Sequence, residues 1–304
     1  MKPAPFRYYR PTSLQEALDV LARVGGHGKV LAGGQSLVPL LSMRLAEPEA
    51  VVDINAVPGL DTIEVRDDVV HVGALVRHTD LERDEHVFAA QPLLRRALRL
   101  VAHPTIRNRG TTMGSLAHAD PAAEMPAVLT LLGGRVLARS AAPGRPVERW
   151  VRAGDFFVGP MESALRPDEL AVGFEVPVAA AGEGTAIGEV ARRHGDYAVC
   201  GVAVRVVLSD GLVTTADAAY VSAGECGRVY PLADGRLPLR PEALDVPALA
   251  GQARKVVSTE ADIHASAQYR SQLVEVLTAR AVRSALVDAG AGGDADSARA
   301  GRVA

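Results

Sequence analysis

The segment Ala32-Gly33-Gly34-Gln35-Ser36-Leu37 has the residue types and the spacing needed to bind an anion. Val30, Leu31 and Ala32 are typical of a short buried strand, and Ser36 is predicted to cap a helix that follows. Paired glycines at such a junction let bare backbone N–H groups and the positive end of a helix approach a phosphate closely. The same pair could serve only as a tight turn, and spacing alone leaves both interpretations open.

A second loop, Arg109-Gly110-Thr111-Thr112-Met113-Gly114-Ser115, combines glycine with hydroxyl side chains. It lies in a polar stretch, 103–115, that precedes Asp120-Pro121. Its N–H and O–H groups could donate hydrogen bonds to a second phosphate. Two loops of this kind together suit a diphosphate.

Two serines mark helices on either side of the first loop. Ser13, followed by Glu16, predicts a capped helix that ends at Gly25-Gly26. Ser36 predicts a second helix, which begins directly after the loop and tolerates Pro39 in its first turn. The residues of this second helix that are expected to face inward are Leu37, Leu40, Leu41 and Leu45.

Two further capping patterns accompany the second loop. Thr79, with Glu82 at the capping-box position, predicts one helix before the loop. Asp120, followed by Pro121 at the first helical position, predicts another helix after the loop, which ends near Gly133. The loop is therefore expected to lie between helical elements.

A domain junction is predicted at residues 177–184, because bulky apolar residues vanish there and small, flexible residues cluster. Beyond it, residues 199–208 and 212–221 predict an antiparallel hairpin that turns at Asp210-Gly211.

Two helices, at about 241–250 and 263–287, are expected to close this second part of the chain. Residues 288–304 are rich in Ala, Gly and Asp without periodicity. They are predicted to be a disordered tail.

Charge and cysteine content exclude several classes of function. Lys and Arg number 33 against 36 Asp and Glu, a formal net charge of -3 at pH 7, so no overall positive field is available to bind nucleic acid or anionic lipid. The two cysteines, Cys200 and Cys226, are too few for a disulfide framework, a four-cysteine zinc site or an iron–sulfur cluster. Any such centre is expected on another chain.

Composition and the absence of several sequence motifs argue against further classes of protein. The 304 residues are 48% hydrophobic and 23% charged, as in ordinary folded proteins. Residues 1–10 lack the apolar core of a signal peptide, and no apolar run is long enough to predict a membrane span, so a cytoplasmic protein is expected. No Gly-x-Ser-x-Gly elbow, P-loop, His-Glu-x-x-His helix or Gly-x-Gly-x-x-Gly turn occurs, which disfavours a Rossmann enzyme or a simple metallohydrolase.

Several strings of residues, spread over nearly the whole chain up to the tail, match one family pattern. They are KVLAGGQSLVP at 29–39, RNRGT at 107–111, AHADPAAE at 117–124, DFF at 155–157, ARRHGDYA at 191–198 and DIHASAQYR at 262–270. Together they closely resemble the FAD-binding medium subunit of molybdenum hydroxylases, the family of carbon monoxide dehydrogenase and xanthine dehydrogenase.

The resemblance implies an α+β fold in two domains. Residues 1–177 would form a two-part FAD-binding module of the vanillyl-alcohol-oxidase/p-cresol-methylhydroxylase type. Residues 178–287 would form a smaller C-terminal flavoprotein domain with an antiparallel sheet and helices. The cofactor would be FAD, and no residue of this chain is expected to be catalytic or to bind a metal.

In that family, the segment that matches the first loop holds the FAD diphosphate through its backbone, and the segment that matches 111–115 completes the cradle from the other side. The cofactor-binding residues that the resemblance implies in and beside the loops are Lys29, Ala32, Gly33, Gly34, Gln35, Ser36, Leu37, Thr111, Thr112, Met113, Gly114 and Ser115.

Two more cofactor-binding residues are implied outside the loops. Glu124 matches an acidic residue near the ribityl or ribose hydroxyls, with a solvated carboxylate at a helix start as the alternative. Tyr197 matches an aromatic position near the isoalloxazine, where a ring can stack on the flavin or shield it, with a buried core tyrosine as the alternative.

The chain departs from the family pattern at two positions. The pattern Thr-x-Gly-Gly in the second loop becomes Thr-Thr-Met-Gly here, so Met113 puts a side chain where bare backbone usually approaches the cofactor. If that position needs a positive φ, methionine would be strained or the loop would shift. A lysine of some relatives is also absent, because Gly188 lies at about its place.

His103 and His118, in polar loops, are assigned structural roles.

The implied function is electron transfer. A large partner subunit with molybdopterin would oxidise the substrate, with water as the oxygen source, and a small partner subunit would carry two 2Fe–2S clusters. This chain would pass the electrons through FAD to an acceptor, in a heterohexamer. A free-standing FAD-dependent oxidoreductase or tailoring enzyme of the same fold is the alternative, and a subunit that has lost FAD is a third reading.

Overall fold

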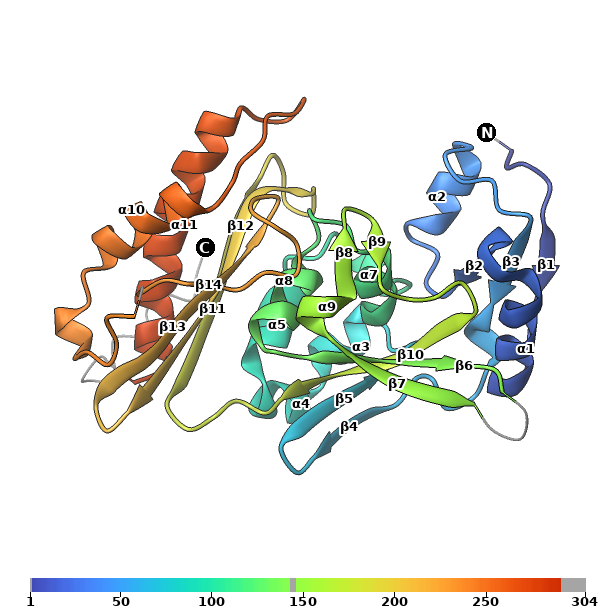
Figure 1. Cartoon of the computed structure of the whole chain (residues 1–304), viewed down its shortest axis with the longest axis horizontal. Coiled ribbons are helices and arrows are strands. Elements are labelled where there is room, and N and C mark those ends of the chain that lie inside the picture. The colour runs from blue at the N-terminus through green and yellow to red at the C-terminus, as the bar shows by residue number, and fades with distance from the viewer. Residues whose placement is uncertain (1, 143–145, 234, 291–304) are drawn as a thin grey trace. The chain divides into compact units, whose positions relative to one another are not determined.

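The computed structural model describes residues 2–142, 146–233 and 235–290, and its internal contacts divide the chain into two compact units (Figure 1). Unit 1 contains the chain up to Asp120 and then Gly133–Val178. Unit 2 contains Pro121–Leu132 and the chain from Ala179 onward. The chain therefore contributes one short segment to unit 2 before the rest of that unit follows in sequence.

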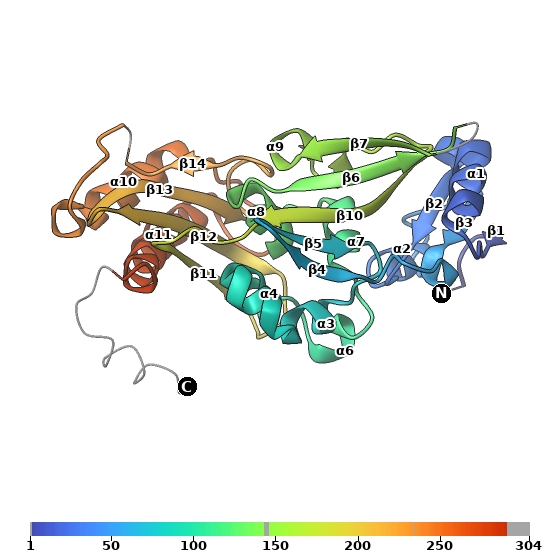
Figure 2. The ribbon, with the colours of Figure 1, turned by 90° about the horizontal axis from the view of Figure 1, so that it is seen from below.

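Unit 1 contains a parallel sheet and an antiparallel sheet (Figure 2), and a separate short pair of strands that is labelled in Figure 1. Its strands are β1 (Arg7–Tyr9), β2 (Gly28–Leu31), β3 (Ala50–Asp53), β4 (Ile63–Arg66), β5 (Val69–Gly73), β6 (Arg135–Ser140), β7 (Val147–Arg152), β8 (Phe157–Gly159), β9 (Glu162–Ser163) and β10 (Glu169–Pro177). In the parallel sheet, β3 lies between β1 and β2. The antiparallel sheet has the strand order β4-β5-β10-β6-β7, and β8 pairs with β9.

The helices of unit 1 are short. They are α1 (Leu14–Val24), α2 (Leu37–Ser42), α3 (His78–Arg83), α4 (Glu85–Ala90), α5 (Pro92–Leu98), α6 (Pro104–Arg107), α7 (Thr112–His118) and α9 (Ala153–Phe156), with 3-10 turns at Gly25–His27 and Ile54–Ala56. Helix α1 is confirmed as predicted, because Ser13 accepts a hydrogen bond from the Glu16 N–H and Gly25, at φ +50°, ends it. Glu16 in turn accepts a hydrogen bond from the Thr12 N–H at 2.8 Å.

Helix α2 begins where it was predicted, directly after Ser36, but its capping and its end differ from the prediction. Ser36 occupies the position before the helix, but its side chain makes no capping hydrogen bond. The helix ends at Ser42, and Arg44 then adopts φ +57°, so the helical periodicity does not continue to Leu45. Leu45 is 72% exposed, and of the four leucines expected to face inward only Leu41 is buried.

The prediction that Thr79 caps a helix is wrong. Helix α3 begins one residue earlier, at His78, and the Thr79 hydroxyl donates a hydrogen bond to Asn108 Oδ1 at 2.7 Å. Glu82 does not reach back to the helix start, because its carboxylate accepts a hydrogen bond from Arg107 Nε at 2.9 Å. Both side chains therefore form hydrogen bonds with residues that are distant in sequence instead of capping the helix.

Unit 2 contains one antiparallel sheet and helices that pack on it. Its elements are α8 (Glu124–Leu131), β11 (Glu183–Ala191), β12 (Ala198–Ser209), β13 (Leu212–Val221), β14 (Tyr230–Pro231), α10 (Val246–Val256) and α11 (Ala267–Asp288), with a 3-10 turn at Pro241–Ala243. The sheet order is β11-β12-β13-β14, and the predicted hairpin is confirmed, with Asp210 and Gly211 both at positive φ in its turn. Helix α11 contacts β11 and β12, and α8 contacts β12 and β13.

The central strand of this sheet is apolar without alternation. Every residue from Ala198 to Val204 is buried, as expected for a strand that is covered on both faces.

Helix α8 begins at Glu124 rather than at Pro121, so the predicted helix start at Asp120 is wrong by three residues. Helix α11 extends to Asp288, whose carboxylate accepts a hydrogen bond from the Thr185 N–H at 2.9 Å. Most of the predicted tail, residues 291–304, lies outside the described residues.

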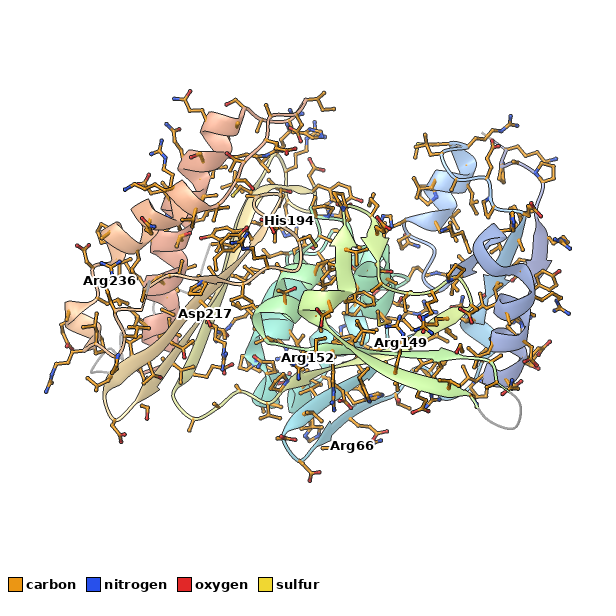
Figure 3. All side chains as sticks on the ribbon, in the orientation of Figure 1. Arg66, Arg149, Arg152, His194, Asp217 and Arg236 are labelled. Carbon is orange, nitrogen blue, oxygen red and sulfur yellow. The ribbon has the colours of Figure 1, made fainter. Side chains whose placement is uncertain are left out.

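A buried carboxylate joins three segments of unit 1. Glu169, at the start of β10, accepts hydrogen bonds from Arg149 Nε (2.6 Å) and Nη2 (2.7 Å) on β7, and from the Arg166 N–H (2.7 Å). Arg149, labelled in Figure 3, also donates to the carbonyl of Ala164 at 2.6 Å. Burial by itself would raise the pKa of Glu169, but these hydrogen bonds outweigh burial and hold the pKa below its usual value.

Replacement of this carboxylate should cost stability in a pH-dependent way. Glu169→Gln should lower the free energy of unfolding by about 2 kcal/mol near pH 7, because two charge-assisted hydrogen bonds weaken in a buried site. Since the folded pKa is depressed, the contribution is present above pH 4.5 and is lost as the pH falls through the folded value. Urea unfolding at several pH values measures it.

Glu148→Gln is the matched control, because Glu148 pairs with Arg139 between the neighbouring strands β7 and β6 but is half exposed. It should cost much less than Glu169→Gln. Equal losses in both variants, or a Glu169→Gln loss that persists unchanged in acid, would contradict the assignment.

Candidate functional site

The two glycine-containing loops predicted from the sequence lie in direct contact within unit 1. A Cβ atom placed on Gly33 would lie 2.5 Å from the carbonyl oxygen of Arg109, 2.7 Å from Gly110 Cα and 2.9 Å from the Thr111 nitrogen. All three distances are shorter than real Cβ atoms tolerate. Only glycine at position 33 allows the two backbones to pack this closely.

The first loop presents a run of backbone donors. None of the N–H groups from Gly33 to Leu37 donates a hydrogen bond to any residue that the structure describes. Gly34 adopts φ +74°, which glycine accommodates without strain. The Gln35 side chain donates to the Gly33 carbonyl at 3.1 Å and so fixes the turn from inside. Five consecutive N–H groups, from Gly33 to the first residue of α2, therefore have no partner among the described residues, and donors in such a turn before a helix suit an anion.

In the second loop, more of the hydrogen-bond donors are already bonded within the protein. The Thr111 hydroxyl caps α7 by accepting a hydrogen bond from the Gly114 N–H at 3.1 Å, and the Thr112 N–H donates to the Val76 carbonyl at 3.3 Å. Thr111, Thr112 and Met113 are all buried. The second loop is therefore a rigid support packed against the first loop, and it supplies fewer donors of its own.

Met113 causes no backbone strain. It lies in α7, where its φ is not positive, and its side chain is only 2% exposed. The loop therefore accepts methionine with an ordinary helical backbone, and the side chain packs in the core. The left-handed backbone that would have strained this residue does not occur.

A histidine that the sequence analysis missed supports the second loop. The backbone N–H of His78 donates to the Gly110 carbonyl at 3.0 Å, and its Nδ1 lies 3.1 Å from Thr112 Oγ1. Burial, aided by the positive charge of Arg107, lowers the pKa of His78 to about 4, so the ring is neutral near pH 7. No local pattern marks His78, because its partners lie more than 30 positions away in sequence.

The other predicted site residues occupy different places. Lys29 is exposed on β2 of unit 1. Glu124 is the first residue of α8 in unit 2 and is only 6% exposed, which rules out the solvated carboxylate considered as an alternative. Tyr197 lies between β11 and β12 of unit 2 and is 69% exposed, so the buried core tyrosine considered as an alternative is also wrong.

Unit 2 contains a second acidic residue that the sequence analysis did not single out. Glu189, on β11, is partly buried, and its Oε2 has no hydrogen-bond partner among the described residues. Burial raises the pKa of Glu189 to about 8, and the negative charge of Glu124 adds to this effect. Near pH 7 the carboxyl group of Glu189 is therefore largely protonated.

This raised pKa should appear in the pH dependence of stability. The folded value of about 8 lies above the ordinary 4.5, so the carboxyl group costs nothing below pH 4.5, the loss of stability grows as the pH rises from 4.5 to 8, and it is complete above 8. Glu189→Gln should remove that loss, and the variant should exceed the wild-type chain in unfolding midpoint near pH 9 but not near pH 5.

The exposed residue Glu242 provides the control, and Glu242→Gln should leave the profile unchanged. Parallel pH profiles for the wild-type chain and Glu189→Gln would disprove the raised pKa.

Family comparisons agree with the resemblance inferred from the sequence. Residues 4–179 match the family described as FAD binding domain in molybdopterin dehydrogenase, and residues 185–285 match the CO dehydrogenase flavoprotein C-terminal domain. The chain is 39% identical over 286 residues to caffeine dehydrogenase subunit beta from a Pseudomonas species, covering 94% of this chain and 96% of the relative. It is 33% identical over 295 residues to the carbon monoxide dehydrogenase medium chain of Afipia carboxidovorans, covering 94% and 98%.

Solved structures give the same result. The crystal structure of quinoline 2-oxidoreductase from Pseudomonas putida superposes with a TM-score of 0.87 at 34% identity, covering 95% of this chain and 99% of that chain. Carbon monoxide dehydrogenase from Hydrogenophaga pseudoflava superposes with a TM-score of 0.86 at 32% identity, covering 95% and 99%. These matches confirm the predicted α+β fold and the predicted cofactor. The chain belongs to the FAD-binding flavoprotein subunits of the molybdopterin dehydrogenases, a family of oxidoreductases.

Proposed function

We propose that this chain passes electrons from partner iron–sulfur clusters through FAD to an acceptor, and that the two loops of unit 1 hold the FAD diphosphate. The observation that carries the proposal is the close packing of Gly33 on the backbone of Arg109 and Gly110, beside a run of N–H donors at Gly33 to Leu37. A diphosphate only accepts hydrogen bonds, and the five N–H groups of this run donate to no described residue, so they can donate to phosphate oxygens.

Each loop has a different part in holding the cofactor. The backbone N–H groups of Gly33, Gly34, Gln35, Ser36 and Leu37 bind the phosphate oxygens, assisted by the positive end of α2. Residues 111–115 support this loop from behind, with the Ser115 hydroxyl as a further donor. When bound, FAD supplies the isoalloxazine ring that accepts and releases electrons, and no side chain of this chain needs to act as an acid or a base toward the organic substrate.

Three residues outside the loops complete the proposed set. The Glu124 carboxyl group accepts hydrogen bonds from ribose or ribityl hydroxyls, and the exposed ring of Tyr197 covers the flavin. Lys29 provides a positive charge at the strand that leads to the first loop. The domains we propose are the FAD-binding domain at residues 1–177 and the C-terminal domain at residues 178–287, although Pro121–Leu132, which includes Glu124, packs within unit 2.

The partners we propose are a large subunit with molybdopterin and a small subunit with two 2Fe–2S clusters, assembled as a heterohexamer in the cytoplasm. Relatives named as a subunit beta and a medium chain support a multi-subunit enzyme. Two cysteines in the whole chain are too few to ligate an iron–sulfur cluster, so the clusters must lie elsewhere. Among the helices of the described residues, none has the length and apolar character that crossing a membrane requires.

Met113, where the chain departs from the family pattern, is an ordinary buried residue of α7, so this departure does not favour the free-standing enzyme over the electron-transfer subunit.

The loop contact can be tested by adding one methyl group. Gly33→Ala should reduce FAD content at least about tenfold, since a Cβ 2.5 Å from a carbonyl oxygen forces the two loops apart. Gly26→Ala is the matched control, because a Cβ there meets nothing within 4 Å. Acid release and chromatography of the flavin from the full-length proteins measure the content and identify it as FAD rather than FMN. Normal FAD content in soluble Gly33→Ala would refute the proposed cradle.

The partners can be tested by mild affinity purification of the full-length chain from the organism that makes it. Two further polypeptides should copurify, and the preparation should contain molybdenum and iron as well as FAD, with about four iron atoms for each FAD if two 2Fe–2S clusters are present. A chain that elutes alone, carries FAD without molybdenum or iron, and oxidises a small molecule would establish the free-standing enzyme instead.

A further inference from the structure

Two side chains that the sequence analysis did not single out connect the two loops from behind. Asn55 Nδ2 donates to the Ala32 carbonyl at 2.9 Å, at the start of the first loop. Arg77 Nη2 donates to Asn55 Oδ1 at 2.8 Å, and Arg77 Nη1 donates to the Arg109 carbonyl at 2.7 Å, at the start of the second loop. The carbonyls of Ala32 and Arg109 are thereby joined through two side chains.

We propose that this Asn55–Arg77 bridge is the positioning device that sets the spacing and direction of the phosphate-binding loops. The inference rests on the proposed function, because it presumes that these loops hold FAD. Asn55 and Arg77 act through the loop backbone and need not touch the cofactor.

The bridge fixes the direction of a donor through peptide geometry. A trans peptide is planar, and its C=O and N–H groups point in opposite directions. When Asn55 holds the Ala32 carbonyl, the N–H of Gly33, which belongs to the same peptide, points away from the bridge. That N–H is the first in the run that donates to no described residue. Hydrogen bonding at the carbonyl also polarises the peptide, which strengthens its N–H as a donor.

The bridge is anchored on the side of Asn55. Asp53 Oδ1 accepts hydrogen bonds from the Asn55 N–H at 3.0 Å and from Asn55 Nδ2 at 2.6 Å, and the Tyr8 hydroxyl donates to Asp53 Oδ2. Asp53 ends β3 in register with Leu31 at the end of β2. The amide group of Asn55 is therefore held against the strand from which the first loop leaves.

The bridge is anchored equally on the side of Arg77. The backbone around Arg77 pairs with the second loop in antiparallel fashion, since the His78 N–H donates to the Gly110 carbonyl and the Thr112 N–H donates to the Val76 carbonyl. The guanidinium of Arg77 then reaches from the second loop to Asn55. One planar group with several donors can span two acceptors in this way, whereas a lysine ammonium on a flexible stem cannot reproduce the fork.

The contrast between arginine and lysine allows a test of whether Arg77 positions the loops or only attracts a phosphate by its charge. Arg77→Lys keeps the positive charge but removes the span between Asn55 and Arg109. Asn55→Asp is isosteric and retains an acceptor for Arg77, but it removes the donor and places a carboxylate oxygen against both the Ala32 carbonyl and the Asp53 carboxylate. Both variants should break the bridge at different points without creating a cavity.

FAD titration into flavin-free full-length protein tests the proposal, with flavin fluorescence as the readout and the melting temperature of each flavin-free variant as a second measurement. Each single variant should weaken FAD binding about 10- to 100-fold, the range expected for a lost hydrogen bond to a charged group. The double variant should be no weaker than the worse single variant, because each change already breaks the same connection. The matched control is Arg135→Lys, since Arg135 contacts Glu175 and Trp150 within the antiparallel sheet, and this variant should bind FAD normally.

Wild-type affinity in Arg77→Lys would show that charge alone matters and would overturn the bridge. Independent, additive losses in the double variant would overturn it as well. If Arg77→Lys does not fold, Asn55→Asp decides alone, and an unchanged affinity in that folded variant refutes the proposal. Failure of the wild-type chain itself to bind FAD would instead contradict the proposed function, so the two failures can be told apart.

Discussion

The packing of Gly33 on the backbone of residues 109–111 is the constraint on which the site in unit 1 depends. Two main chains that approach this closely leave no room for a Cβ, so the relative position of the loops is set by rigid backbone rather than by flexible side chains. The second loop thereby restricts the backbone at Gly33, the first residue of the run whose N–H groups donate to no described residue. A preorganised site of this kind loses little conformational entropy when an anion binds.

Hydrogen bonds from Arg77 and His78 stabilise the contact between the two loops. The segment around Arg77 and His78 pairs with the second loop through its backbone, while the Arg77 side chain extends to Asn55 and so to the first loop. The neutral ring of His78 beside Thr112 adds a polar contact that carries no charge into the core. The side chains of Asn55, Arg77 and His78 each have a hydrogen-bonding neighbour on another segment, and for the buried His78 this is the condition for placing a polar side chain in a packed interior.

Two carboxyl groups that are at least partly buried, one in each unit, have pKa values shifted in opposite directions because their partners differ. Glu169 is buried with an arginine and a backbone N–H, and its pKa falls. Glu189 is partly buried near another carboxyl group, and its pKa rises to about 8. The desolvation cost has the same sign in both cases, and hydrogen-bond donors decide the outcome. A protonated carboxyl group beside Glu124 also means that this pair need not hold two negative charges near pH 7.

What the sequence by itself determined is what depends on neighbours a few residues apart. The cap at Ser13, the turn at Asp210-Gly211 and the two glycine loops were all predicted, because capping, positive φ and strand alternation are local properties. The family pattern added the cofactor and the overall fold. Where a local signal failed, as at Thr79, a distant side chain had taken the capping group.

Only the tertiary structure decided the rest. The tight turn at Gly33-Gly34 is present, and the second loop packs against it, while anion binding there stays a prediction. Only the structure showed that Met113 lies within a helix and has no positive φ. Asn55, Arg77, His78 and Glu189 carry no sequence signal, since their roles depend on partners that are 22 or more positions away. Burial and long-range hydrogen bonds arise from the packed chain, and no short stretch of sequence contains them.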